Sequence, residues 1–219
     1  GAALSSALTA VDEAAEPTGF ARHSGFQRLE AARSVLIADI GAARGGGATS
    51  GNYQSSASFH FSSGRSRIVV NCGSGAQLPG EWLAALKQAA AHSTLSTEPR
   101  DAAAALFRNA VITHRRAEDP RGHLLEIDRS FGEAAATKHM RRFYLAVRGD
   151  DLRGEDRLIG APPAVAAGWR LRFHLHPGVK ASLARDNRSI ILALPNREGW
   201  RFRSNCRRIA IERSIYCGE

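Results

Sequence analysis

Residues 169–177 have the sequence Trp-Arg-Leu-Arg-Phe-His-Leu-His-Pro. Over the first eight positions, apolar residues alternate strictly with arginine or histidine. Because successive side chains of a β-strand point to opposite faces, this period of two predicts a half-buried strand that ends at the proline. Shorter alternations occupy residues 143–147 and 209–211. The second half of the chain is therefore expected to consist of short strands.

The first half contains three further β-like runs, at residues 34–39, 57–62 and 67–72. Ser63-Gly64 lies between the second and third runs and is a strong hairpin signal. Turn-forming residues interrupt the second half of the chain at intervals of about ten residues. Several short, half-buried strands at that spacing predict an antiparallel β-sandwich.

One segment has helical character. Residues 81–91 follow Pro79-Gly80, are rich in strong helix formers and begin with a glutamate, which predicts a short amphipathic helix. The predicted fold class is therefore all-β, an antiparallel β-sandwich with one short helix. Residues 1–18 lack a clear period and are interpreted as a leader or linker, and residues 19–219 as one domain.

Composition limits the classes of function. The 219 residues are 43% apolar, which suffices for a domain with a core, and the longest apolar runs are too short to span a bilayer. Thirty basic residues against 21 acidic ones give a charge of +9, which favours nucleic acid, anionic polysaccharide or a charged envelope surface as partner. Because aromatic residues are only 7% of the chain, the stacking platforms typical of nucleic-acid modules are not expected.

The chain has three cysteines, Cys72, Cys206 and Cys217, and no Cys-x-x-Cys motif. This pattern excludes a zinc ribbon and a thioredoxin-type redox pair. A Cys206–Cys217 bridge and three buried thiols both remain open, since spacing alone does not decide between them.

Several common catalytic motifs are absent. The glycine triplet at residues 45–47 precedes no Gly-Lys-Ser/Thr and is interpreted as a loop, and no Gly-x-Ser-x-Gly elbow occurs. His174 and His176 lie on one face of a predicted strand, a geometry that suits either a metal or a polar face near a turn. Arginine pairs two apart on strands, such as Arg201 and Arg203, would form a cationic stripe suited to a linear polyanion.

Three C-terminal stretches, residues 172–181, 189–195 and 199–202, resemble the C-terminal β domain of heparinase II/III-like proteins, which include bacterial polysaccharide lyases. Other segments resemble the same domain in the same order, namely residues 25–39, 58–61, 69–73, the Ala-His-Ser-Thr-Leu block at 91–95, and an acidic turn at 153–158. The resemblance covers roughly residues 20–219 and rests on all of these segments occurring in the family's order, rather than on any single motif.

The resemblance implies a β-supersandwich that packs on an α/α-toroid domain, with a polysaccharide cleft between them. It also implies β-elimination on a uronic-acid sugar, in which a base removes the C5 proton and positive charge neutralises the uronate. The toroid is missing and residue 1 is not methionine, so we expect a piece of a longer protein that is inactive without an N-terminal toroid domain or chain. Residence in the bacterial periplasm or cell envelope is implied by the family alone, since no signal peptide is visible.

The family's zinc site is substituted in this sequence. Gly51, Tyr53 and Ser55 occupy the positions of its His-x-His-Ala-Asp motif, Asn71 replaces a ligand aspartate, and only His92 matches. Asparagine and tyrosine are poor zinc ligands beside histidine and carboxylate. His92 and Asn71 are therefore predicted to be the remnant of a degenerate zinc site.

The predicted substrate-binding residues are Tyr53, His60, Arg65 and Arg67, with the two arginines as anion contacts. No catalytic residue is assigned within the chain. Three functions follow: the β domain of a polysaccharide lyase, a non-catalytic β-sandwich that binds acidic polysaccharide, and a basic scaffold or nucleic-acid-binding domain.

Overall fold

The computed structural model describes residues 19–21, 24–41, 54–75, 78–97, 110–131 and 136–218. Its first sheet contains β1 (Phe20–Ala21), β2 (Phe26–Ala31), β3 (Ser34–Asp39), β4 (Phe59–Ser63), β5 (Ser66–Val70) and β12 (His174–Leu175). The second contains β7 (Val111–Asp119), β8 (Gly122–Phe131), β9 (Thr137–Ala146) and β10 (Leu152–Ile159). Smaller sheets pair β6 (Leu95–Thr97) with β11 (Trp169–Leu171), and join β13 (Lys180–Leu183), β14 (Ser189–Ala193) and β15 (Gly199–Arg203).

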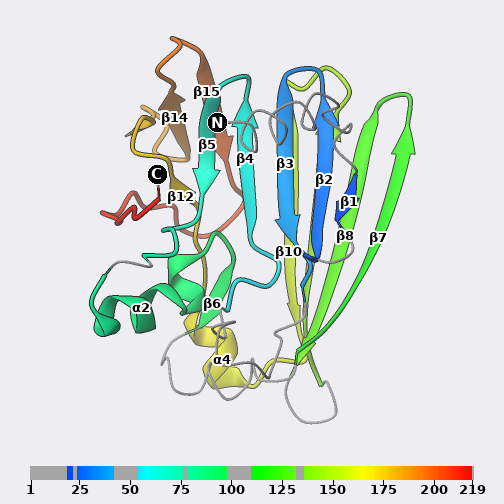
Figure 1. The fold of residues 1–219 in the computed structure, drawn as a ribbon, viewed down its shortest axis with the longest axis vertical. Coiled ribbons are helices and arrows are strands. Elements are labelled where there is room, and N and C mark those ends of the chain that lie inside the picture. Colours follow the sequence, from blue (N-terminus) through cyan, green and yellow to red (C-terminus); the bar gives the residue numbers. More distant parts are fainter. Residues whose placement is uncertain are drawn as a thin grey trace, which may run out of the picture.

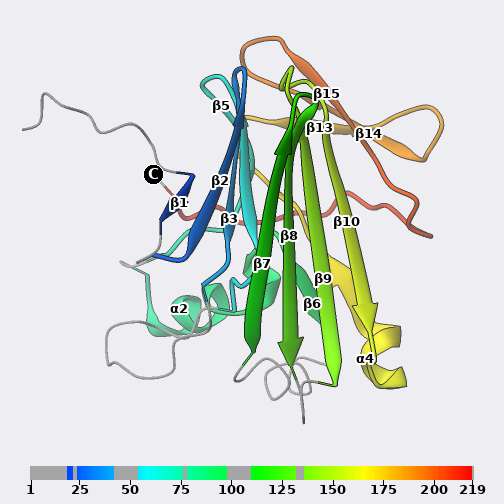
Figure 2. The same ribbon diagram turned by 90° about the vertical axis from the view of Figure 1, so that its right-hand side faces the viewer.

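Two antiparallel layers form the body of the protein (Figure 1). The first has the strand order β1-β2-β3-β4-β5-β12 and the second β10-β9-β8-β7. In Figure 2 the layers lie face to face, with β13–β15 across one end. The prediction of an all-β antiparallel sandwich is thereby confirmed, while residues 1–18 lie outside the described part of the chain.

Apolar side chains from both layers form the main core. Leu29 and Leu36 of the first sheet and Leu125 and Leu145 of the second are fully buried in one cluster. The rings of Phe59 and Phe143 meet across the layers with centroids 4.7 Å apart. Residues of β14 and the segment after it extend this cluster, so the C-terminal sheet shares the core. Each fully buried leucine or phenylalanine contributes about 1.5–3 kcal/mol to folding.

The stretch at residues 169–176 is less regular than its alternation predicts. It is broken after Leu171, and its two halves pair with different sheets: β11 with β6, and β12 with β5. Every side chain from Leu171 to His176 is half-buried rather than alternately buried and exposed. The reason is that this segment crosses from one sheet to the next, so both of its faces meet protein.

Three other local predictions need correction. Residues 153–158, expected as an acidic turn, form most of β10, and residues 209–211 are not in a strand. The expected helix at 81–91 is confirmed in part, as α2 (Gly80–Leu86) followed by the 3-10 turn η1 (Ala89–Ala91). A second short helix, α4 (Pro163–Gly168), was not predicted.

The hairpin predicted at Ser63-Gly64 joins β4 to β5, and Gly64 has a positive φ of 56°. Across the described ranges, no helix has the length and apolar character needed to cross a membrane.

Candidate functional site

Three imidazoles gather where β4 begins and β5 ends. His60 lies on β4, His92 follows η1, and His174 of β12 pairs with Val70 of β5. Burial, and then the neighbouring His174 and His60, lower the pKa of His92 to about 4. Burial also lowers the pKa of His60 and of His174. All three rings are therefore neutral at pH 7.

Hydrogen bonds define the tautomer of His174. Its Nε2 lies 2.9 Å from the carbonyl oxygen of Ala90 and must donate, because a carbonyl only accepts. Its Nδ1 then accepts a hydrogen bond from the hydroxyl of Ser214 at 2.8 Å. The same Nδ1 lies 3.4 Å from Sγ of Cys72. This histidine, for which the sequence left a metal site and a polar face near a turn both open, ties β12 to the C-terminal segment.

A buried arginine of the second sheet positions the segments that carry His60 and His92. Arg141 is 1% exposed, and its Nη1 donates to the carbonyl oxygens of Ala57 at 2.7 Å and Ser93 at 2.9 Å. Ala57 precedes β4, and Ser93 follows His92 directly. One guanidinium therefore fixes the backbone on both sides of the imidazole cluster.

Arg129, also 1% exposed, holds the same loop from β8. Its Nη1 donates to the carbonyl oxygen of Ser56 at 3.1 Å, and the Thr94 hydroxyl donates to that same oxygen at 3.1 Å. Burial, and next the charge of Arg141, lower the pKa of Arg129 to about 9, so it stays protonated at pH 7. The loop before β4 is thus bound to both layers.

Asp156 balances the charge of Arg141. Its Oδ1 accepts from Arg141 Nε at 2.6 Å and from His139 Nε2 at 2.7 Å, and its Oδ2 accepts from Arg141 Nη2 at 3.2 Å. Burial alone would raise the pKa of Asp156, but the Arg141 charge and these hydrogen bonds outweigh it and lower the pKa to about 2. A buried charge without such a partner would be strongly destabilising.

The described residues do not fit a zinc ion. Asn71 uses Oδ1 to accept the Ser93 N–H at 2.8 Å and Nδ2 to donate to the Ser58 hydroxyl at 3.3 Å. Its carboxamide therefore joins β5 to the His92 segment. Within the described ranges, no three His, Cys, Asp or Glu side chains are arranged to hold a metal. Zinc sites require three or four such donors.

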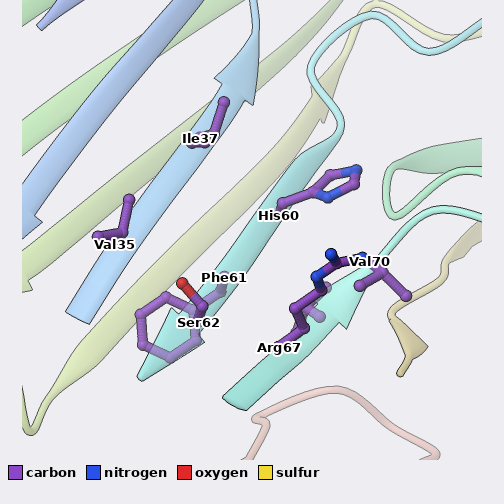
Figure 3. A pocket seen from close by; sticks show the side chains of 8 residues that line it. Val35, Ile37, His60, Phe61, Ser62, Arg67 and Val70 are labelled. Atoms are coloured by element: carbon purple, nitrogen blue, oxygen red, sulfur yellow. The ribbon is translucent and has the colours of Figure 1, made fainter. Parts of the chain in front are cut away.

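A shallow hollow lies on the outer face of the first sheet, away from the core (Figure 3). It is lined by Val35, Ile37, His60, Phe61, Ser62, Arg67, Val69 and Val70. Figure 3 shows His60 and Arg67 projecting side by side from neighbouring strands, with Ile37 and Val35 on the next strand. The volume of about 170 Å³ is below the roughly 300 Å³ of small-molecule sites, so this hollow would hold part of a larger ligand.

The structure unites some of the predicted site residues and separates others. His60 and Arg67 share the hollow, and His60, Asn71 and His92 lie near the start of β4 and the end of β5. Arg65 is exposed in the β4–β5 turn, at the opposite end of the hairpin from His60, and does not line the hollow. Tyr53 lies outside the described residues.

Comparison with known proteins identifies the family. The sequence matches the family described as Heparinase II/III-like, C-terminal, over residues 13–219. The chain belongs to this family.

The heparinase II/III-like domain also resembles solved lyases in fold. It superposes on heparan sulfate lyase HepC from Pedobacter heparinus with a TM-score of 0.61 and 12% identity, covering 80% of this chain and 27% of that one. Against a heparinase III, the BT4657 gene product, the TM-score is 0.62 at 15% identity, covering 85% of this chain and 28% of that one. At these identities the likeness concerns the fold alone.

A curated relative is FtsZ-localized protein C of the bacterium Caulobacter vibrioides. The identity is 29% over an alignment of 236 residues, and the alignment covers 98% of this chain and 41% of the relative. The heparinase II/III-like domain therefore spans less than half the length of this relative.

Sequence reasoning missed the residues that hold the site in place, namely Arg129, Arg141, His139 and Asp156. On β9 the buried residues are the odd-numbered ones from Thr137 to Leu145. The alternation noted at residues 143–147 thus continues backwards through Arg141 and His139, but with polar side chains on the inward face. This alternation could have indicated a longer strand, because its period of two continues at positions where the inward side chain is polar.

Proposed function

We propose that this heparinase II/III-like domain completes the polysaccharide cleft of a longer lyase and does not cleave polysaccharide alone. The observation that carries the proposal is the hollow on β3–β5, where a cationic Arg67 and a neutral His60 project together beside exposed Ile37. A guanidinium suits a uronate carboxylate, and an apolar patch suits the face of a sugar ring. The hollow is too small for a chain of sugars, which is consistent with a cleft whose other wall belongs to an N-terminal domain.

The proposed chemistry is β-elimination beside a uronate. Neutralising the carboxylate makes the C5 proton more acidic, and we assign that role to Arg67. We assign no catalytic base to this chain, and the base and the acid would come from the N-terminal portion. In the cell, the proposed site of action is the bacterial envelope or periplasm, and recovery of the native protein only in the cytosolic fraction would contradict this location.

The test is a lyase assay on two forms of the protein. The 219-residue chain should release no unsaturated uronate product, measured by ultraviolet absorbance, from uronic-acid polysaccharides. The longer native protein should release it, and Arg67→Gln in that protein should reduce kcat/KM at least tenfold. Arg65→Gln is the matched control, since Arg65 is exposed outside the hollow. Product formation by the isolated chain would refute the proposal, as would an equal loss of kcat/KM in Arg67→Gln and Arg65→Gln.

A second candidate is a non-catalytic domain that binds acidic polysaccharide. The observation that favours it is the distribution of charge: residues 163–219 contain 11 of the 30 basic but only four of the 21 acidic residues. Of those acids, Asp186 pairs with Arg201 and Glu198 with Arg33. Arg203, Arg207 and Arg208 are exposed and form no ion pair among the described residues. The name of the Caulobacter relative likewise refers to localisation with FtsZ and not to a lyase.

Binding to sulfated or uronate polymers distinguishes this candidate. Replacing Arg203, Arg207 and Arg208 with glutamine should weaken binding at least tenfold and reduce its salt dependence. The matched control replaces Arg115, Arg153 and Arg157, which are exposed but paired with acidic residues. Equal loss in both triple variants would contradict a specific surface. Preferential competition by DNA at physiological salt would point instead to nucleic acid.

A further inference from the structure

The C-terminal segment lies across the end of β5 and brings a second thiol to Cys72. The backbone N–H of Cys217 donates to the carbonyl oxygen of Cys72 with an N–O distance of 2.6 Å. Standard covalent geometry then holds the two Cα atoms within about 6.5 Å of each other. Disulfides join cysteines whose Cα atoms are about 4.4–6.8 Å apart, so the backbone separation of Cys72 and Cys217 is compatible with a disulfide.

The side chains of Cys72 and Cys217 also belong to the same apolar cluster. Cys72 is buried in a small cluster with Leu86 and Ala91, and the partly buried Cys217 packs against that cluster. Both thiols are free in this structure, as is the exposed Cys206. Two thiols in one apolar cluster, on hydrogen-bonded backbones, are well placed to react with each other.

Gly73 makes this close approach feasible. It has a φ of 97°, and a Cβ on this residue would lie 2.6 Å from the carbonyl carbon of Cys217. Any other residue would push the C-terminal segment away from β5. The absence of a side chain on Gly73 thus leaves room for the backbone of Cys217 directly beside Cys72.

We propose that Cys72 and Cys217 are a site of reversible disulfide formation that fastens the C-terminal segment to β5. This inference goes beyond the proposed function and does not depend on it. The neighbouring Tyr216 is the link to the hollow, because its hydroxyl accepts a hydrogen bond from Arg67 Nη1 at 3.2 Å. Its ring also lies against that of His176, with centroids 5.2 Å apart. The disulfide would therefore fix Tyr216 beside the cationic side of the hollow.

The oxidant is a small-molecule disulfide such as oxidised glutathione. The more accessible Cys217 attacks first, which forms a mixed disulfide and releases one small thiol. The Cys72 sulfur then attacks Sγ of Cys217, the mixed disulfide breaks, and the second small thiol leaves. Two protein thiols lose two protons and two electrons, and the small disulfide gains them as two thiols.

The experiment is oxidation of the folded 219-residue chain with oxidised glutathione, followed by alkylation of free thiols and peptide mass spectrometry without reduction. We expect one intramolecular link between the peptides of Cys72 and Cys217, reversed by dithiothreitol. Cys206→Ser should form the same link, whereas Cys217→Ser should form none. The linked protein should unfold at a temperature higher by about 5 °C than the reduced protein.

Three results would overturn the proposal. The first is a link between Cys206 and Cys217, the alternative that spacing alone leaves open. The second is an unlinked Cys72 beside a glutathione adduct on Cys217. The third is a link that forms only after the protein has been unfolded in urea, since the proposal requires the two segments to be close together in the folded state.

Discussion

Arg141 shows how one residue determines the geometry of the candidate site. Its guanidinium donates four hydrogen bonds, to two backbone carbonyls and to both oxygens of Asp156. The guanidinium carbon also lies over the rings of Phe59 and Phe143. A lysine, with one compact ammonium group, could not reach all these acceptors. The side chain is therefore both a buried charge and the support of the loop before β4.

We predict that Arg141→Met lowers the free energy of unfolding by about 3–5 kcal/mol, because Asp156 loses its charge partner while buried. Arg142→Met is the matched control on the same strand. Arg142 is 40% exposed and pairs with Glu126 and Glu155, so its loss should cost about 0–1 kcal/mol. Urea denaturation monitored by fluorescence measures both, and similar losses in the two variants would contradict the role of Arg141.

We predict that the buried His139 makes the stability of the protein depend on pH. Burial lowers its pKa, the charges of Arg141 and Arg129 act in the same direction, and the Asp156 carboxylate only partly opposes them. The folded state thus excludes a proton that the unfolded state binds below about pH 6.5. Stability should therefore be unaffected by this group above pH 7 and fall as the pH drops through 6.5.

In His139→Gln, the loss of stability between pH 7 and pH 5 should be smaller than in the wild type, as measured by urea titration at each pH. Asp156 remains ionised over that range, so it does not contribute to the slope. His114→Gln, at an exposed position of β7, should leave the wild-type slope unchanged. An unchanged slope in His139→Gln would show that this ring does not contribute to the loss of stability at low pH.

At the scale of elements, the two sheets are joined at one end by a contact between hairpin turns. Gly149 follows β9 with a φ of 69°, and its carbonyl oxygen accepts a hydrogen bond from the buried Ser34 hydroxyl at 2.6 Å. A Cβ on Gly149 would lie 2.3 Å from the carbonyl oxygen of Ala31. The β9–β10 turn can therefore rest on the β2–β3 turn only if this residue is glycine.

Gly149→Ala should reduce the free energy of unfolding by about 1–3 kcal/mol, through the positive φ and the clash with Ala31. The control is Gly199→Ala in β15, where a Cβ would meet nothing within 4 Å. Thermal unfolding of the two variants is the measurement. A neutral Gly149→Ala would mean that the two turns do not hold the layers together.

The alternation of hydrophobic residues predicts some elements well and others poorly, for a physical reason. Ser34–Asp39 forms the strand expected there, because its inward Leu36 and Ala38 are apolar and its neighbours on both sides pair with it. β10 was not expected, since its inward position at Asp156 carries a charge that only Arg141 and His139 make tolerable. A strand whose interior face is polar cannot be recognised without its partners.

At the scale of the whole molecule, the candidate site depends on segments from both halves of the chain. Asn71 and His92 come from the first half, while His174 and Arg141 come from the second. The chain belongs to the heparinase II/III-like family, and no three His, Cys, Asp or Glu side chains among its described residues are arranged to hold a metal.

We predict that the purified chain contains far less than one zinc per molecule, measured by inductively coupled plasma mass spectrometry after preparation without chelators. Asn71 is engaged with Ser93 and Ser58, so it offers no ligand beside His92. Treatment with a chelator should leave the unfolding temperature unchanged. Stoichiometric zinc that disappears in His92→Ala would contradict this prediction and restore the family's metal site.

The sequence by itself determined the fold class, the β4–β5 hairpin and the family, because these depend on local periodicity, turn chemistry and ordered motifs. Only the tertiary structure decided that Arg65 is remote, that Asn71 is a structural residue, and that Arg129 and Arg141 support the loop before β4. It also decided that Cys217 meets Cys72 and not Cys206. Contacts of this kind join residues far apart in the chain, and their free energies depend on burial and on partners that no local pattern contains.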